Sequence, residues 1–170
     1  MTARRVHAEG TYTHFVTFSC YKRRQFLAPD ICKRIVIRTL GSCLAKQNGI
    51  CCGFVTMPDH VHAALWFPDE NQISLPMNKW KENSSKQIAA AYARQFPSYW
   101  SKIDPHDPIW QARYYGFNIY SYGKLRQEVE YMHNNPVRLK LVPDPCDWPW
   151  SSARFLLLGK PVEITISWPP

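Results

Sequence analysis

The chain has 170 residues, of which 45% are hydrophobic and 14% aromatic, and its formal net charge is +8. This composition favours one globular domain with its own core and excludes a disordered or low-complexity protein. No apolar run approaches the roughly eighteen residues of a membrane-spanning helix. We also expect no signal peptide, and therefore a cytoplasmic protein. The excess of Lys and Arg predicts a polyanionic partner, with nucleic acid as the first candidate.

The first half of the chain alternates strand and helix signals. β-Branched and aromatic residues predict a strand at 13–21, and the basic loop 22–24 follows it. Residues 30–49 predict a helix, with an aspartate to cap its start and Asn-Gly to end it. Two more strands are expected at 50–58 and 60–67, joined by a tight Met-Pro-Asp connection.

The second half continues this alternation. Residues 73–96 predict a long helix, and the proline-bearing segment 97–108 predicts a loop. A fourth strand is expected at 114–121. The helix predicted at 123–135 ends at Pro136, because proline lacks the backbone N–H and clashes with the preceding turn.

The resulting order, β-α-β-β-α-β-α, is that of the split βαβ, ferredoxin-like plan with one extra helix. We therefore expect an α+β fold, with helices packed on an antiparallel sheet. Seven of the fourteen prolines lie in 136–170. This distribution of prolines predicts a folded domain over 1–140, with residues 141–170 as an irregular, proline-rich tail packed on the same domain.

Six cysteines are spread along the chain without a CxxC pair, which argues against a zinc finger. Cys51 and Cys52 are adjacent, and neighbours of this kind suit a disulfide poorly. We expect the cysteines to act as small buried apolar side chains.

The stretch MPDHVHAALWF (57–67) places two histidines in a predicted strand. Side chains alternate across a strand, so His60 and His62 share one face. The opposite face is apolar and is expected to be the core face: Val61, Ala63, Leu65 and Phe67. Two imidazoles at this spacing can converge on a metal ion. Two ordinary half-exposed histidines would give the same pattern.

The last predicted helix carries two stripes at helical spacing. One is apolar and is expected to be buried: Leu125, Val129 and Met132. The other holds a base, an acid, a phenol and an amide: Lys124, Glu128, Tyr131 and Asn135. A solvated helix face is the ordinary explanation for such a stripe.

The same residues also suit one reaction. A tyrosine hydroxyl can attack a phosphodiester and hold DNA covalently, and Tyr131 is the candidate. A divalent cation can polarise the phosphate that is attacked. Asn135 could offer an amide oxygen as a third ligand beside His60 and His62. It precedes Pro136, which disfavours helical geometry and could free this side chain. Asp59 is expected as a turn residue, and His133 points away from the tyrosine face.

Taken together, these motifs resemble the single-tyrosine HUH transposases of bacteria, and most closely their REP-associated branch. The resemblance covers about 11–155 and rests on MPDHVHAALW, WQARYY, YMHNNPVRLKLV and DWPWSSA. It implies a ferredoxin-like fold, with His60, His62 and Asn135 as ligands of Mg²⁺ or Mn²⁺ and Tyr131 as the nucleophile. It also implies cleavage of single-stranded DNA beside a hairpin, through a 5′-phosphotyrosine that a free 3′-hydroxyl can reverse.

Candidate DNA contacts are basic residues near aromatic or catalytic ones: Lys22, Arg23, Arg24, Arg113 and Lys124. A solvated turn and a core aromatic cluster would explain the same residues. A monomer is favoured, although a homodimer is compatible with the resemblance.

Two other functions remain open. A zinc hydrolase could use the HxH pair, but it would need further ligands, and the remaining histidines are scattered: His7, His14, His106 and His133. A relative that has lost catalysis could bind hairpin DNA or RNA without cutting it.

Overall fold

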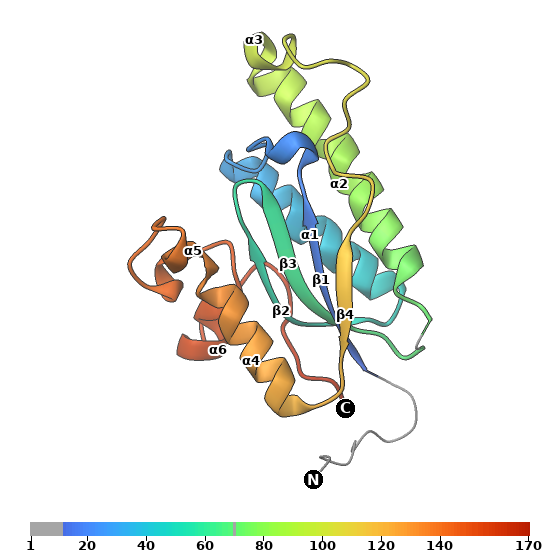
Figure 1. The fold of residues 1–170 in the computed structure, drawn as a ribbon, viewed down its shortest axis with the longest axis vertical. Helices are drawn as coiled ribbons and strands as arrows, with labels where there is room; N and C mark the ends of the chain where they lie inside the picture. The colour runs from blue at the N-terminus through green and yellow to red at the C-terminus, as the bar shows by residue number, and fades with distance from the viewer. Residues whose placement is uncertain (1–11, 70) are drawn as a thin grey trace.

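The computed structural model describes residues 12–69 and 71–170. Its sheet contains β1 (Thr13–Ser19), β2 (Ile50–Thr56), β3 (His60–Trp66) and β4 (Tyr115–Ile119). Their order is β2-β3-β1-β4, and each strand is antiparallel to its neighbours (Figure 1). This is the order of the split βαβ plan, so the predicted α+β, ferredoxin-like fold is confirmed.

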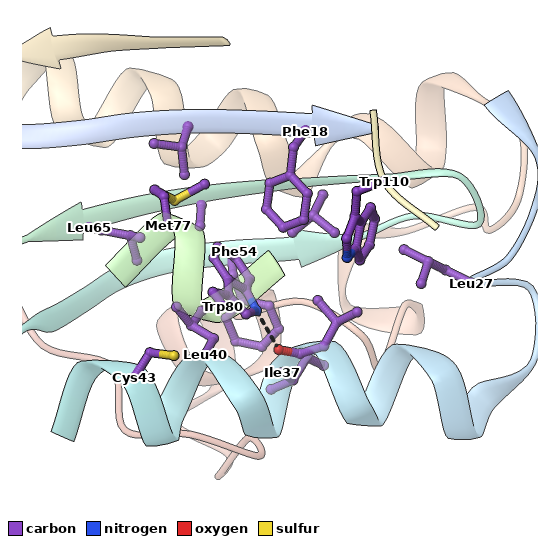
Figure 2. Packing of buried hydrophobic residues seen from close by; sticks show 14 of the residues in the cluster. Phe18, Leu27, Ile37, Leu40, Cys43, Phe54, Leu65, Met77, Trp80 and Trp110 are labelled. Atoms are coloured by element: carbon purple, nitrogen blue, oxygen red, sulfur yellow. Dashed lines mark hydrogen bonds between the residues drawn. The ribbon is translucent and has the colours of Figure 1, made fainter. Parts of the chain in front are cut away.

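Two helices cover one face of the sheet. α1 (Asp30–Lys46) and α2 (Ser74–Gln95) pack on each other behind the strands in Figure 1. Trp80 of α2 is 1% exposed, and its indole N–H donates to the backbone oxygen of Val36 in α1 at 2.9 Å (Figure 2). This bond satisfies the one polar atom of a large buried ring and fixes the two helices in register.

The opposite face is covered only in part. α4 (Tyr122–His133) packs over β2 and β3. Its predicted apolar stripe is buried as expected: Leu125, Val129 and Met132. α4 lies close to β2 because Gly53 has no side chain, and a Cβ there would approach Val129 to 3.0 Å. The sheet therefore has a second apolar core, on the face that carries the histidines.

The last part of the chain returns to the edge of the sheet at β2. Backbone bonds join Phe54 to Ser152, and Cys51 to Ser167. Between them lies α6 (Ala153–Leu158). The tail was expected to be irregular, and this short helix was not foreseen, because its six residues lie among prolines and give little periodic signal.

Four smaller elements also lie where none was expected. α3 (Pro97–Trp100) occupies the predicted loop 97–108, and α5 (Asn135–Arg138) follows α4 after a break at Asn134. Pro136 thus ends one helix but begins another, since proline fits the first turn of a helix. The 3₁₀ turns η1 (Tyr21–Arg23) and η2 (Pro145–Asp147) complete the elements.

All six cysteines are free and five are buried, as the sequence predicted. None of the helices within the described residues has the length and apolarity needed to cross a membrane.

Candidate active site

The site begins at the turn that leads into β3. The backbone N–H of Met57 donates to the carbonyl of His60 at 2.8 Å, which closes the turn directly before the strand. His60 is 6% exposed and His62 is half-buried, and both lie on the α4 face. Their ring centroids are 4.9 Å apart. The strand alternation therefore brings both imidazoles to one place, as predicted.

Each imidazole is held through its Nδ1 atom. Nδ1 of His60 lies 2.7 Å from Oδ1 of Asp59, and Nδ1 of His62 lies 2.6 Å from Oγ1 of Thr17, its cross-strand neighbour. Asp59 also accepts an ion pair from Nε of Arg23 at 2.9 Å. These contacts fix the ring orientations through Nδ1, so that Nε2 is the nitrogen of each ring that can bind a metal ion.

The surroundings keep both histidines neutral. Burial, together with the nearby His60, Arg138 and Arg23, lowers the pKa of His62 to about 3. Burial also lowers the pKa of His60, although Asp59 opposes that shift. A neutral imidazole keeps the lone pair that a metal ligand needs.

α4 and α5 bring the other predicted residues to the same place. Asn135 is 6% exposed, and its Nδ2 lies 3.1 Å from Nε2 of His60. The ring of Tyr131 is centred 6.4 Å from that of His62, and Tyr131 is 47% exposed. The polar residues of this helical stripe therefore differ in exposure. The Asn135 amide turns inward, whereas the Tyr131 phenol reaches solvent beside the histidines.

Arg138 is a member of this group that the sequence analysis missed. Its guanidinium carbon lies 4.0 Å from the centre of the Tyr131 ring, and its Nη2 donates to Oδ1 of Asn135 at 3.3 Å. It follows Tyr131 by seven residues and Asn135 by three, which is helical spacing. The expectation that the helix stops at Pro136 hid this signal.

Asp59 and His133 have roles that were not foreseen. Asp59 belongs to a turn, as expected, but it also orients His60. His133 does point away from Tyr131. Its Nε2 lies 2.7 Å from Oγ of Ser152, and that oxygen accepts the backbone N–H of Phe54 at 2.9 Å. Burial lowers the pKa of His133 to about 4. Through the contacts of Ser152, His133 connects the end of α4 to β2 and to the tail.

The basic residues are dispersed, and most are paired. Lys22 and Arg24 both pair with Asp107, at 3.3 and 2.7 Å, and Arg23 pairs with Asp59. Lys124 pairs with Glu128 one helical turn away. Arg113 is exposed, and no ion pair joins it to any carboxylate that the structure describes. Of these residues, Arg23 is the one drawn directly into the histidine group.

The group offers two imidazole nitrogens and an amide oxygen, once the Asn135 amide turns about its last bond. Within the described residues, no three His, Cys, Asp or Glu side chains gather in a metal-binding arrangement. The donor set thus fits a divalent cation that takes its remaining ligands from a phosphate or from water. His7, named above among the scattered histidines, lies outside the described residues.

Similarity to known proteins identifies the family. Residues 7–135 match the family described as "Transposase IS200 like". The chain belongs to the IS200-like transposase family. No curated protein shows significant similarity to this transposase.

Solved structures share the fold of this IS200-like transposase. A REP-associated tyrosine transposase bound to a REP hairpin is 22% identical, with a TM-score of 0.67. That match covers 98% of this chain and 93% of the other. A candidate transposase from Deinococcus radiodurans R1 is 17% identical, with a TM-score of 0.53, over 79% of this chain and 97% of the other. The predicted resemblance and fold class are confirmed.

Proposed function

We propose that this transposase cleaves and rejoins single-stranded DNA beside a hairpin, through a covalent bond between Tyr131 and the 5′-phosphate of the cut strand. The observation that supports this most strongly is the meeting of Asn135 with His60, beside an accessible phenol. Two helices and two strands converge to hold a nucleophile next to a set of neutral ligands. Membership of the family makes transposition the expected context.

The ligands that we assign to a divalent cation, Mg²⁺ or Mn²⁺, are His60, His62 and Asn135. When bound, such a cation supplies the positive charge that polarises the scissile phosphate and stabilises the charge that develops on it. The protein contributes two imidazoles whose orientation Asp59 and Thr17 fix, so that little reorganisation is needed on binding. The three assigned ligands are uncharged, which favours coupled binding of cation and DNA.

Tyr131 acts on the phosphate as the nucleophile. Its hydroxyl oxygen forms the new P–O bond as the hydroxyl proton leaves, and the bond from phosphorus to the 3′ oxygen breaks. The departing 3′ oxygen takes up a proton and becomes a free hydroxyl. One phosphodiester replaces another, so the 3′-hydroxyl of a second strand can reverse the step without an external energy source. Arg138 is a positioning residue here, because it lies over the Tyr131 ring.

The proposed partner is DNA that carries a hairpin and a single-stranded flank. The net charge of +8 favours a polyanion, and the most similar structure described above binds a REP hairpin. Among the candidate contacts, Arg113 is the most accessible, whereas Lys22, Arg23, Arg24 and Lys124 would have to share their ion-pair partners with phosphate. We place this activity in the cytoplasm.

We further propose that residues 1–140 form the catalytic unit, that 141–170 is an arm of the same domain, and that the protein acts as a monomer. This tail pairs with the outer edge of β2 at Cys51 and Val55. An edge that is already covered offers less backbone for pairing with a second chain.

A covalent trapping assay tests the proposal. Single-stranded hairpin DNA from the gene's own flanks is incubated with the protein and Mg²⁺ or Mn²⁺, then separated on a denaturing gel. We expect a shifted band with the wild type and none with Tyr131→Phe or His60→Ala. Tight DNA binding without any adduct would instead favour the non-catalytic hairpin-binding module. Tightly bound zinc in the purified protein would favour the zinc hydrolase.

A further inference from the structure

Tyr115 shares a cross-strand row with the candidate ligand His62. Thr17 of β1 lies opposite His62 of β3 on one side and opposite Tyr115 of β4 on the other. Directly opposed residues project from the same face of a sheet. Because neighbouring strands lie about 4.8 Å apart, Tyr115 stands roughly 10 Å from His62 along this row.

Aromatic rings connect these two residues across the same face. The Phe15 ring is centred 5.6 Å from that of His62 and stacks on Phe117, at 5.0 Å with an interplanar angle of 19°. Phe117 in turn lies 6.1 Å from Tyr115. The aromatic surface therefore continues from the candidate active site to the outermost strand.

This part of the face is open to solvent. α4 packs over β2 and β3, whereas β4 is the strand at the opposite edge of the same sheet (Figure 1). Tyr115 is 67% exposed, the highest value for any large apolar or aromatic side chain in the described part of the chain. Phe117, the next residue on this face of β4, is half-buried. Core packing explains Phe15, which is 3% exposed, but it does not explain an exposed ring at the end of the row.

We propose that Tyr115, backed by Phe117, is a stacking platform for a base of single-stranded DNA close to the phosphate held at His60 and His62. This inference rests on the proposed function. An unpaired base has a free face that an aromatic ring can stack against, and such stacking tolerates any sequence. The net charge of +8 and the exposed Arg113, two residues before Tyr115, complement the backbone of such a strand.

The test separates base stacking from phosphate binding. All proteins carry Tyr131→Phe, so that binding is measured without cleavage. One labelled probe is a hairpin from the gene's own flanks with a run of thymidines on each side. The other has abasic sites in place of the thymidines, with the same phosphates. Fluorescence anisotropy gives Kd for each probe.

We expect Tyr115→Ala to weaken binding of the thymidine probe by about 5- to 100-fold, the range for loss of one stacked base. Binding of the abasic probe should not change. Tyr115→Phe, which keeps the ring, should retain the affinity of the parent protein. Tyr99→Ala is the matched control, because Tyr99 is 45% exposed but lies on α3.

An equal effect of Tyr115→Ala on both probes, or no effect on either, would overturn the platform. The proposed chemistry can be overturned independently of the platform. If Tyr131 forms no covalent adduct but Tyr115→Ala still removes the preference for thymidines, the platform stands and the chemistry does not.

Discussion

The amide nitrogen of Asn135 lies 3.1 Å from Nε2 of His60, although 75 residues separate them in the chain. Oδ1 of the same amide accepts a hydrogen bond from Arg138 at 3.3 Å. One side chain thus links the strand that carries the histidines to the helix pair that carries the phenol. The relative placement of nucleophile and ligands depends on this contact.

The side chains behind the histidines should control metal affinity. Asp59→Asn removes the carboxylate that orients His60, and Thr17→Val removes the hydroxyl beside His62. Each change should weaken Mn²⁺ binding by about 10- to 100-fold, as is usual for the outer partners of a ligand. Calorimetric titration of Mn²⁺ in the presence of hairpin DNA measures this. Unchanged affinity in both variants would contradict the ligand assignment.

Arg138 should affect the reaction more than DNA binding. Arg138→Ala removes the guanidinium over the Tyr131 ring and the bond to Asn135, so single-turnover adduct formation should slow by about 10-fold or more. The affinity for hairpin DNA should fall much less. Lys86→Ala on α2 is the control, since Lys86 is an exposed residue paired only with Glu82 among the described carboxylates. An equal loss in affinity and rate would make Arg138 a simple phosphate contact.

Ser152 should contribute to stability through a buried polar contact. Ser152→Ala leaves the backbone N–H of Phe54 and Nε2 of His133 without their partner, away from water. The free energy of unfolding should fall by about 1–3 kcal/mol. Urea denaturation measures the change, and Ser98→Ala in the exposed α3 should have almost no effect. A loss below a few tenths of a kcal/mol would mean that water replaces the hydroxyl.

Stability should decrease as the pH falls below about 6.5. The pKa of His62 is lowered to about 3 and that of His133 to about 4, so both stay neutral in the folded protein. The unfolded chain binds their protons first, near pH 6.5, which favours unfolding. Between pH 7.5 and 5.5 each histidine should remove about 1 kcal/mol from the free energy of unfolding. Urea titrations in EDTA test this, and His133→Asn should show a smaller decrease.

Much of the fold followed from local patterns. The strand alternation assigned His60 and His62 to one face, and the helical wheel separated the buried Leu125 and Val129 from Tyr131. These patterns report the period of each element, which depends only on near neighbours in the chain. The order of the elements along the chain was then enough to predict the antiparallel, ferredoxin-like sheet.

The contacts that complete the site were harder to foresee. Thr17 and Asp59 orient the histidines, but neither role is visible without the strand register and the turn geometry. Arg138 was missed because Pro136 was expected to end the helix before it, whereas Pro136 lies in the first turn of a new helix. In the sequence, Tyr115 is one of several neighbouring aromatic residues. Only the register of β1 with β3 and β4 shows that it lies in line with His62.

The most direct test of the central claim is to identify the residue and the DNA end that are joined. The adduct is formed with hairpin DNA labelled on either side of the nick, digested with protease and nuclease, and analysed by mass spectrometry. We predict that the strand 3′ of the nick is attached through its 5′-phosphate to Tyr131, and that the other product ends in a 3′-hydroxyl that a polymerase extends. Attachment at Tyr120 or Tyr122, or through a 3′-phosphate, would contradict the account.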